Sequence, residues 1–284
     1  MSLVSGDENR PLMYKYRPDN QNTLRILRNQ EMYFSFVADF NDPFDCRVTV
    51  DCKGTEEDWI RYSENLPIPI PQNIKTVTIN YLRSINFDPE KIRTLYKQQN
   101  FRTIVVYCLS EVHNNILMWS HYSNCHRGLC LGFGTEIEGN SLGIKINDPT
   151  ANQYPAPLFD DFLPLTKVSY QNELPKPYDI FTGDTDALVA FMKTKARNWE
   201  YEKERRIIVP YRELNKNVVT FAKESLREVI IGCRVHDDFR KEVLDIISAE
   251  YLSSGYKVSV YQADLEDDSY SLRFQGVEMP SSVN

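Results

Sequence analysis

The sequence predicts an α+β fold, with one domain over about residues 12–275 and a mixed, mostly antiparallel sheet. Short strand patterns, some alternating and some continuously apolar, are interleaved with a few amphipathic helical patterns. Neither a repeat nor a low-complexity tract divides the chain, and 284 residues suffice for one large domain. A mostly helical insert is expected near residues 53–100, and residues 1–11 and 276–284 are expected to be flexible termini.

The first strand is predicted at Met13–Arg17, where Pro18 stops it. Its basic residues Lys15 and Arg17 lie two positions apart, so they should share one face of the strand. A short helix capped by Asn22 and a second strand over residues 32–36 follow.

A loop dense in Asn, Asp and aromatic residues comes next, and it contains Asn41, Asp42 and Asp45. Asn and Asp before Pro form turns through their own side chains, which is one interpretation of this loop. The other is the polar edge of a pocket with aromatic walls.

Residues 103–110 form a nearly continuous apolar run that ends at Ser110, which predicts a strand buried on both faces. A short helix over residues 114–122 should place Trp119 and Tyr122 on one side, either as a buried pair or as a wall for a planar ligand. In the next strand, residues 128–133, Gly128 and Gly132 permit neighbouring backbone to approach closely.

Residues 139–165 are rich in Asn, Asp and Pro and indicate an irregular excursion, followed by a strand over residues 165–170. A helix capped by Asp184 or Thr185 then leads into a strand that contains Glu202, Glu204 and Arg206. If this strand begins near Glu202, the three charged side chains share one face. Alone, this pattern is typical of a solvated strand end with ordinary ion pairing.

The end of the chain has a clearer pattern. A buried strand is expected over residues 226–232, an amphipathic helix is expected to start at a cap on Asp237, and a last strand is expected over residues 256–261.

Composition excludes some classes of function. The formal net charge of −7 does not favour non-specific binding to nucleic acid or to anionic membranes. No run approaches the ~20 apolar residues of a membrane span, and the first residues lack a signal-peptide pattern. Six Cys without a C-x-x-C spacing then indicate a reducing, cytoplasmic setting.

A zinc site is one interpretation of the cluster that comprises His121, Cys125, His126 and Cys130. Cys130 lies in an apolar strand pattern, which favours a buried thiol, and we expect no metal.

Four segments together carry a family resemblance. They are Tyr14-Lys15-Tyr16-Arg17, Phe40-Asn41-Asp42-Pro43-Phe44-Asp45, Met118-Trp119-Ser120-His121-Tyr122, and Trp199-Glu200-Tyr201-Glu202-Lys203-Glu204-Arg205-Arg206. In this order they resemble a widespread bacterial family of unknown function, over roughly residues 12–275. That resemblance implies no activity.

The layout also resembles ADP-ribosyltransferases, whose sheet is split. This second resemblance implies NAD as a substrate, a nucleotide-like small molecule as the ligand, and a protein or nucleic acid as the acceptor. It implies Glu204 as the catalytic carboxylate, Glu202 as a secondary one and Ser110 as the middle-strand residue. The implied binding residues are Lys15, Tyr16, Arg17, Asn41, Asp42, Asp45, Trp119, Tyr122, Trp199 and Arg206.

Two alternatives remain open. A metal-dependent phosphodiester or nucleotide hydrolase would gather oxygen ligands from Asp42, Asp45, Glu202 and Glu204. A non-catalytic module would bind a nucleotide or another anion through Lys15, Arg17 and Arg206.

Overall fold

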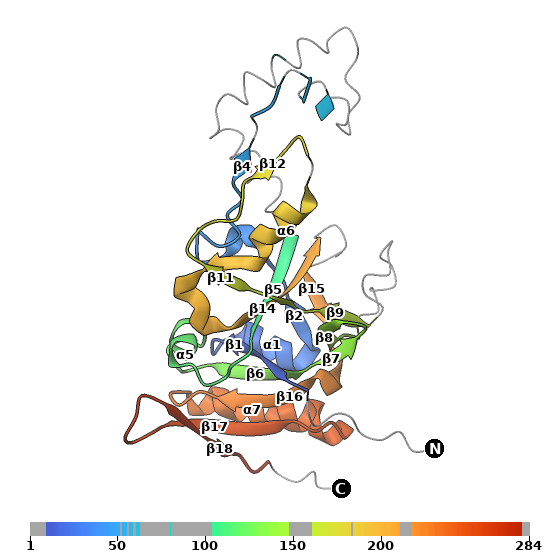
Figure 1. Ribbon diagram of the computed structural model, residues 1–284. Helices are drawn as coiled ribbons and strands as arrows, with labels where there is room; N and C mark the ends of the chain where they lie inside the picture. Colours follow the sequence, from blue (N-terminus) through green and yellow to red (C-terminus); the bar gives the residue numbers. More distant parts are fainter. Residues whose placement is uncertain are drawn as a thin grey trace. The chain divides into compact units, whose positions relative to one another are not determined.

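The computed structural model describes residues 10–51, 53–55, 57–58, 61–62, 80, 104–147, 161–182, 184–210 and 217–279. The chain divides into two compact units, each described here by itself. Unit 1 comprises Met1–Ser35, Val106–Val168 and Asn198–Asn284, and unit 2 comprises Phe36–Val105 and Ser169–Arg197. Figure 1 labels most of their helices and strands.

The main sheet of unit 1 is mixed and mostly antiparallel, which confirms the predicted α+β class. Its strands follow one another in the order β10 (Thr166–Lys167), β14 (Glu204–Pro210), β5 (Ile104–Ser110), β1 (Leu12–Arg17), β6 (Leu129–Gly134), β16 (Leu226–Ile231), β17 (Ser259–Leu265) and β18 (Leu272–Gly276). β1 is antiparallel to both of its neighbours, whereas β16 and β17 run parallel.

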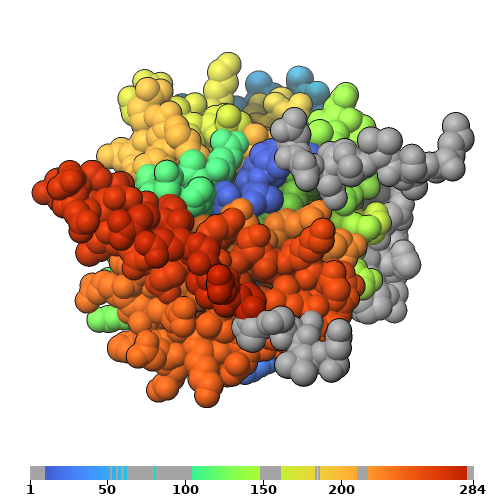
Figure 2. Space-filling model, turned by 90° about the horizontal axis from the view of Figure 1, so that it is seen from below, coloured from blue at the N-terminus to red at the C-terminus, as the bar shows by residue number. Residues whose placement is uncertain are grey.

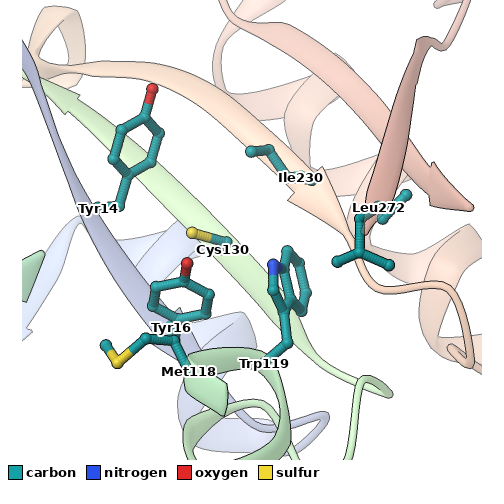
Figure 3. Close-up of a cluster of buried hydrophobic side chains, with 8 residues drawn as sticks. Tyr14, Tyr16, Met118, Trp119, Cys130, Ile230 and Leu272 are labelled. Atoms are coloured by element: carbon teal, nitrogen blue, oxygen red, sulfur yellow. The ribbon is translucent and has the colours of Figure 1, made fainter. Parts of the chain in front are cut away.

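One face of this sheet carries a hydrophobic cluster. Tyr14 and Tyr16 alternate along β1, and Tyr16 lies opposite Cys130 of β6, which in turn lies opposite Ile230 of β16. Helix α5 (Ile116–Tyr122) adds Met118 and the fully buried Trp119 to the same cluster, as Figure 3 shows. The other members of the cluster are Ala263 and Leu272.

The opposite face of the sheet is also apolar near its centre. Because directly paired residues point to the same side, β1, β6 and β16 place a second set of side chains there. All of them are buried: Met13, Leu129, Leu131, Phe133, Val229 and Ile231. A strand buried on both faces explains the continuous apolar runs of β6 and β16.

Helices α1 (Gln21–Asn29) and α7 (Asp237–Glu250) pack against each other. The Tyr251 hydroxyl after α7 donates a hydrogen bond of 2.9 Å to the carbonyl of Leu27 in α1. The cap of α1 is Asn20 rather than the predicted Asn22, because the Asn20 side chain accepts a hydrogen bond from the Thr23 amide. The C-terminal part of the chain, which includes α7 and is coloured orange to red, covers much of the face of the molecule in Figure 2.

Smaller elements complete unit 1. They are β2 (Glu31–Tyr33), paired with β15 (Val218–Thr220); the antiparallel strands β7 (Glu136–Glu138), β8 (Ser141–Lys145) and β9 (Phe162–Pro164); and the 3₁₀ turns η4 (Arg197–Glu202), η6 (Lys223–Ser225) and η7 (Leu252–Ser254). η4 starts at the boundary between the units, as does β3 (Ser35–Phe36). β8 and β9 correct the prediction of an irregular excursion over residues 139–165 at their own positions, because Gly and Pro obscure short strands in a sequence pattern, and residues 148–160 of that range lie outside the described residues.

Unit 2 contains the 3₁₀ turn η1 (Val37–Asp39) and helix α6 (Thr185–Lys193), which Asp184 caps through the Asp186 amide. β4 (Val50–Asp51) pairs in parallel with β12 (Tyr178–Asp179), and β11 (Ser169–Gln171) pairs in parallel with β13 (Thr194–Ala196). The predicted helix therefore ends earlier than its pattern indicates, at Lys193, where the chain becomes β13.

Some predicted features lie outside the described residues. These are most of the helical insert near residues 53–100 and most of the two termini. Within the described part of the chain, none of the helices is both long and apolar enough to cross a membrane.

Candidate functional site

Strands β1 and β5 separate soon after they meet. β1 pairs with β6 along its whole length, but within the described residues it pairs with β5 at the single position Tyr14–Ser110. Past that position the amine of Lys15 donates a hydrogen bond of 2.7 Å to the carbonyl of Cys108 in β5. A side chain thus satisfies a carbonyl that continuous strand pairing would otherwise use. We call this region the β1–β5 gap.

Arg17 and Tyr107 lie at the same gap. Arg17 follows Lys15 on the same face of β1, as the alternation predicts. Among the described residues, the buried Nε of Arg17 and the hydroxyl of Tyr107 have no hydrogen-bond partner. Burial lowers the pKa of Arg17 and raises the pKa of Tyr107, and the charge of each opposes the shift of the other. The two polar groups therefore lie within electrostatic range of each other.

The amine of Lys15 is poorly solvated. It lies 4.5 Å from the centroid of the Tyr107 ring, and burial lowers its pKa to about 8. The nearby charge of Arg17 lowers the pKa further, whereas Glu204 and Glu202 act in the opposite direction. The two carboxylates therefore lie within electrostatic range of the gap.

Glu204 and Arg206 form a buried ion pair at the start of β14. The Nε of Arg206 donates to Oε1 of Glu204 at 2.7 Å, and its Nη2 donates to Oε2 at 3.1 Å. Glu204 is 4% exposed and Arg206 is fully buried, so the pair is not the solvated strand end that the isolated pattern suggests. The alternation correctly places these two residues on one face.

Glu202 is not part of this strand. It ends the turn η4, and Lys203 then adopts a left-handed conformation with φ of 46°, which interrupts the alternation before β14 begins. Glu202 is nevertheless buried, and Tyr122 donates a hydrogen bond of 2.6 Å to its Oε1. The two predicted carboxylates thus occupy different kinds of structure.

Ser110 holds the backbone of this region. Its hydroxyl donates to the carbonyl of Glu202 at 2.6 Å and accepts from the amide of Val112 at 3.1 Å. Both bonds go to backbone groups, so Ser110 connects the end of β5 to the end of η4.

Two of the predicted binding aromatics are core residues. Trp119 has no exposed surface, and its indole nitrogen donates to the carbonyl of His113 at 2.7 Å. Tyr16 packs edge-to-face on Trp119 with centroids 5.4 Å apart, and its hydroxyl donates to the carbonyl of Val112. Neither ring faces solvent.

Trp199 instead belongs to a partly exposed group of rings, which we call the aromatic platform: His121, Tyr122, Trp199 and Tyr201. The ring centroids of Trp199 and Tyr201 lie 5.9 Å apart, and the ring centroid of His121 lies 6.4 Å from each of theirs. The sequence indicates His121 only as a candidate zinc ligand and does not single out Tyr201, although both residues lie inside the motif segments that contain Trp119 and Trp199.

The remaining predicted residues belong to unit 2. Asn41 is exposed, and Asp42 accepts a hydrogen bond of 2.9 Å from the amide of Phe44, as in an Asx turn. Asp45 is buried and lies 3.5 Å from the amine of Lys195, which is also buried. Asp42 and Asp45 therefore have local structural contacts.

Within the described residues, no group of three or more His, Cys, Asp and Glu side chains is placed to hold a metal ion. Cys130 is fully buried in β6, as its apolar strand pattern predicts.

Residues 118–207 match the family described as "Protein of unknown function (DUF2971)". This segment contains most of α5, all of β6 and the η4–β14 junction, so it includes the aromatic platform and both carboxylates. The match confirms the predicted resemblance to an uncharacterised family of unknown function. No curated protein and no solved structure matches the chain.

Proposed function

We propose that this protein binds a phosphorylated, nucleotide-like small molecule at the β1–β5 gap, through Lys15 and Arg17. The observation that carries the proposal is the pair of buried polar atoms, Nε of Arg17 and the hydroxyl of Tyr107, that have no partner among the described residues. Buried polar groups are nearly always hydrogen-bonded, because an unsatisfied one costs roughly 1–3 kcal/mol. An oxygen of a bound anion would accept from both groups.

The charges of the gap favour an anion. Lys15, Arg17 and Arg206 are basic and Glu202 and Glu204 are acidic, so these five side chains carry one excess positive charge when Lys15 is protonated. Arg206 is committed to Glu204, which leaves Lys15 and Arg17 as the cations for a ligand. They lie about 7 Å apart along the strand, a spacing that suits neighbouring phosphate groups.

Equilibrium binding of ADP, pyrophosphate and adenosine, measured by titration calorimetry, tests this proposal. ADP and pyrophosphate should bind and adenosine should not, and Arg17→Gln and Lys15→Gln should each weaken both ligands at least tenfold. Lys257→Gln is the matched control, because Lys257 is exposed on unit 1 and should leave binding unchanged. The proposal fails if neither phosphorylated ligand binds, or if Lys257→Gln weakens them as much as Arg17→Gln.

We propose further that the ligand is NAD and the reaction ADP-ribosyl transfer, in the cytoplasm. The observation that favours a reaction is the position of two buried carboxylates whose charge reaches Lys15. In such a transfer the bond between nicotinamide and the ribose C1′ breaks and nicotinamide leaves with the electron pair. A lone pair of the acceptor forms the new bond to C1′, and the acceptor loses a proton. With water as acceptor, the product is ADP-ribose.

A carboxylate aimed at the ribose C1′ would stabilise the positive ribosyl centre, and Glu202, whose Oε1 accepts from the Tyr122 hydroxyl, is the residue we propose for this role. Release of nicotinamide from NAD, followed by chromatography, should therefore fall at least 100-fold in Glu202→Gln. Glu111→Gln is the control, since Glu111 forms a partly exposed pair with Arg205. Absence of nicotinamide release from the wild type would exclude the transferase.

A further inference from the structure

We infer that unit 1 has a second binding site, a cavity that takes an acidic α-amino acid such as glutamate. The charged residues that line it are Arg10, Glu136, Glu224 and Arg227, and we call it the arginine cavity. Its volume is about 230 Å³, and the described residues leave it partly open to solvent. The inference does not depend on the proposed function, because it uses none of the residues assigned to the β1–β5 gap.

A β-bulge places Arg227 at this cavity. The register between β16 and β6 shifts between Leu226 and Glu228, so Arg227 is an extra residue without a counterpart on β6. In a regular strand, Arg227 and Glu228 would point to opposite faces of the sheet. A bulge changes the direction of a side chain, and bulges are frequent next to functional sites.

Two glycines of β6 show that Arg227 and Glu228 instead lie over the same face. A Cβ at Gly132 would lie 2.9 Å from Cβ of Glu228. A Cβ at Gly134 would lie 3.1 Å from both Cγ and Nε of Arg227. Because Gly132 and Gly134 are two residues apart, they share one face of β6. Gly134 thus leaves the space in which the Arg227 side chain crosses β6.

The arginine cavity lies on the face of β1 opposite to Lys15 and Arg17. Leu12, which lines the cavity, pairs directly with Gly134 and packs against the hydrophobic cluster that includes Tyr14 (Figure 3). Leu12 and Tyr14 alternate with the residues that point to the other face, where Lys15 and Arg17 lie. A ligand in the arginine cavity therefore does not use the cations of the β1–β5 gap.

Two buried hydroxyls hold the walls of the cavity in place. Thr135, just after β6, donates a hydrogen bond of 2.7 Å to the carbonyl of Pro11, next to Arg10. Ser225 of η6 donates a hydrogen bond of 2.9 Å to the carbonyl of Lys145 in β8. A cavity whose walls are fixed before binding loses less conformational entropy when a ligand enters.

The charges of the lining match a ligand with two carboxylates and one ammonium. Glu224 pairs with Lys145, whose amine lies 3.4 Å from Oε1 of Glu224. The other lining charges are the guanidiniums of Arg10 and Arg227 and the carboxylate of Glu136, with one excess positive charge. A guanidinium has several donors in a planar fork that fits a carboxylate, so it can bind one in addition to another partner. Aspartate and glutamate carry two carboxylates, one ammonium and a single net negative charge.

The size and polarity of the cavity exclude larger and more apolar ligands. Sites for drug-sized ligands have volumes of roughly 300–1,000 Å³, and the arginine cavity lies below this range. Among the described lining residues, Leu12 has the only apolar side chain. A free amino acid with a polar side chain therefore fits better than a nucleotide or an apolar amino acid.

Three probes with the same carbon chain test the inference by titration calorimetry: L-glutamate, L-glutamine and glutarate. Glutamine lacks the side-chain carboxylate and glutarate lacks the ammonium, so each should bind about tenfold or more weakly than glutamate. Arg227→Gln should weaken glutamate by about tenfold or more, because a guanidinium is lost. Glu136→Gln should weaken glutamate but not glutarate, which has no ammonium for Glu136 to bind.

Arg273→Gln is the matched control, since Arg273 is exposed on β18 and does not line the cavity. If Arg227→Gln does not fold, Arg10→Gln replaces it, because Arg10 is exposed and its loss leaves the bulge intact. Failure of glutamate to bind the wild type, or equal affinity for the three probes, would overturn the inference.

Competition with pyrophosphate separates the two sites. Pyrophosphate should not displace glutamate, because Lys15 and Arg17 lie on the other face of β1. Displacement would assign both ligands to one site and overturn the inference. Binding of glutamate without any binding of pyrophosphate would support the arginine cavity and contradict the proposed function.

Discussion

The guanidinium of Arg206 binds both carboxylate oxygens of Glu204 inside unit 1, two residues away on the same strand. Next to it, Arg205 points to the other side of β14 and pairs with Glu111 at 2.7 Å, where both side chains are partly exposed. One strand thus carries a buried and a partly exposed ion pair on consecutive residues. The two pairs should differ strongly in their effect on stability.

Arg206→Met should lower the free energy of unfolding by about 3–5 kcal/mol, because it removes the buried guanidinium that binds both carboxylate oxygens of Glu204. Arg205→Met should cost at most about 1 kcal/mol, because solvent screens its pair with Glu111. Urea unfolding followed by circular dichroism measures both. If the two variants lose similar stability, the contrast between the buried and the exposed pair has no energetic meaning.

Gly128→Ala should destabilise the protein by about 1–3 kcal/mol, because a Cβ at this position would overlap the backbone carbonyl of Arg17. Backbone shifted at Arg17 should also weaken ADP binding. Gly276→Ala is the control, since a Cβ there meets nothing within 4 Å. Thermal unfolding and calorimetry on the two variants check both effects, and unchanged ADP affinity in a destabilised Gly128→Ala would separate the packing of Arg17 from ligand binding.

Relationships between residues that are close in sequence could be predicted from the sequence pattern. Alternation placed Lys15 with Arg17 and Glu204 with Arg206, and Gly128 correctly indicated a close approach of neighbouring backbone, whereas a Cβ at Gly132 would meet the side chains of Glu228 and Tyr14. Each of these relationships follows from the period of a single strand or from the absence of a side chain.

The rest depends on contacts between segments that are distant in sequence. The β1–β5 gap arises because two strands separated by more than 80 residues pair at one position and then part, and no local pattern encodes that separation. The sequence also could not show which aromatic rings remain exposed. Trp119 and Trp199 look equivalent in sequence, but tertiary packing buries only Trp119 completely. Lys203 adopts a left-handed backbone conformation, which Lys rarely does, and Glu202 therefore lies in η4 rather than in β14.

Ser110→Ala should cost about 1–3 kcal/mol of stability, because it leaves the carbonyl of Glu202 and the amide of Val112 without the buried hydroxyl. Ser271→Ala should be nearly neutral, since Ser271 is exposed. If Ser110 only positions η4, nicotinamide release by Ser110→Ala should fall with a changed KM and recover in part in Ser110→Thr. Wild-type stability in Ser110→Ala would contradict the structural role.

The amine of Lys15 should titrate near pH 8, because burial disfavours its charged form. Reductive ¹³C-methylation followed by NMR resolves individual lysines, and Lys15→Met identifies the signal. Glu202→Gln should lower the pKa of Lys15 further, since the negative charge of Glu202 stabilises the ammonium. Affinity for pyrophosphate should decrease as the pH rises through about 8. An unshifted titration of Lys15 in Glu202→Gln would remove the electrostatic link between the carboxylate and the gap.

The same shift makes a prediction about stability. The pKa of Lys15 is about 8 in the folded protein against a usual 10.5, so between these values the unfolded chain binds the proton more tightly. Stability contributed by this group therefore increases with pH over that range and is constant below it. Buried tyrosines such as Tyr107 have raised pKa values and act in the opposite direction, so the contribution of Lys15 must be isolated by difference. Urea unfolding of the wild type and Lys15→Met at pH 7 and pH 10 should show the wild type gaining stability relative to the variant. Lys257→Met should show no such relative change, and a constant difference between wild type and Lys15→Met would contradict the shift.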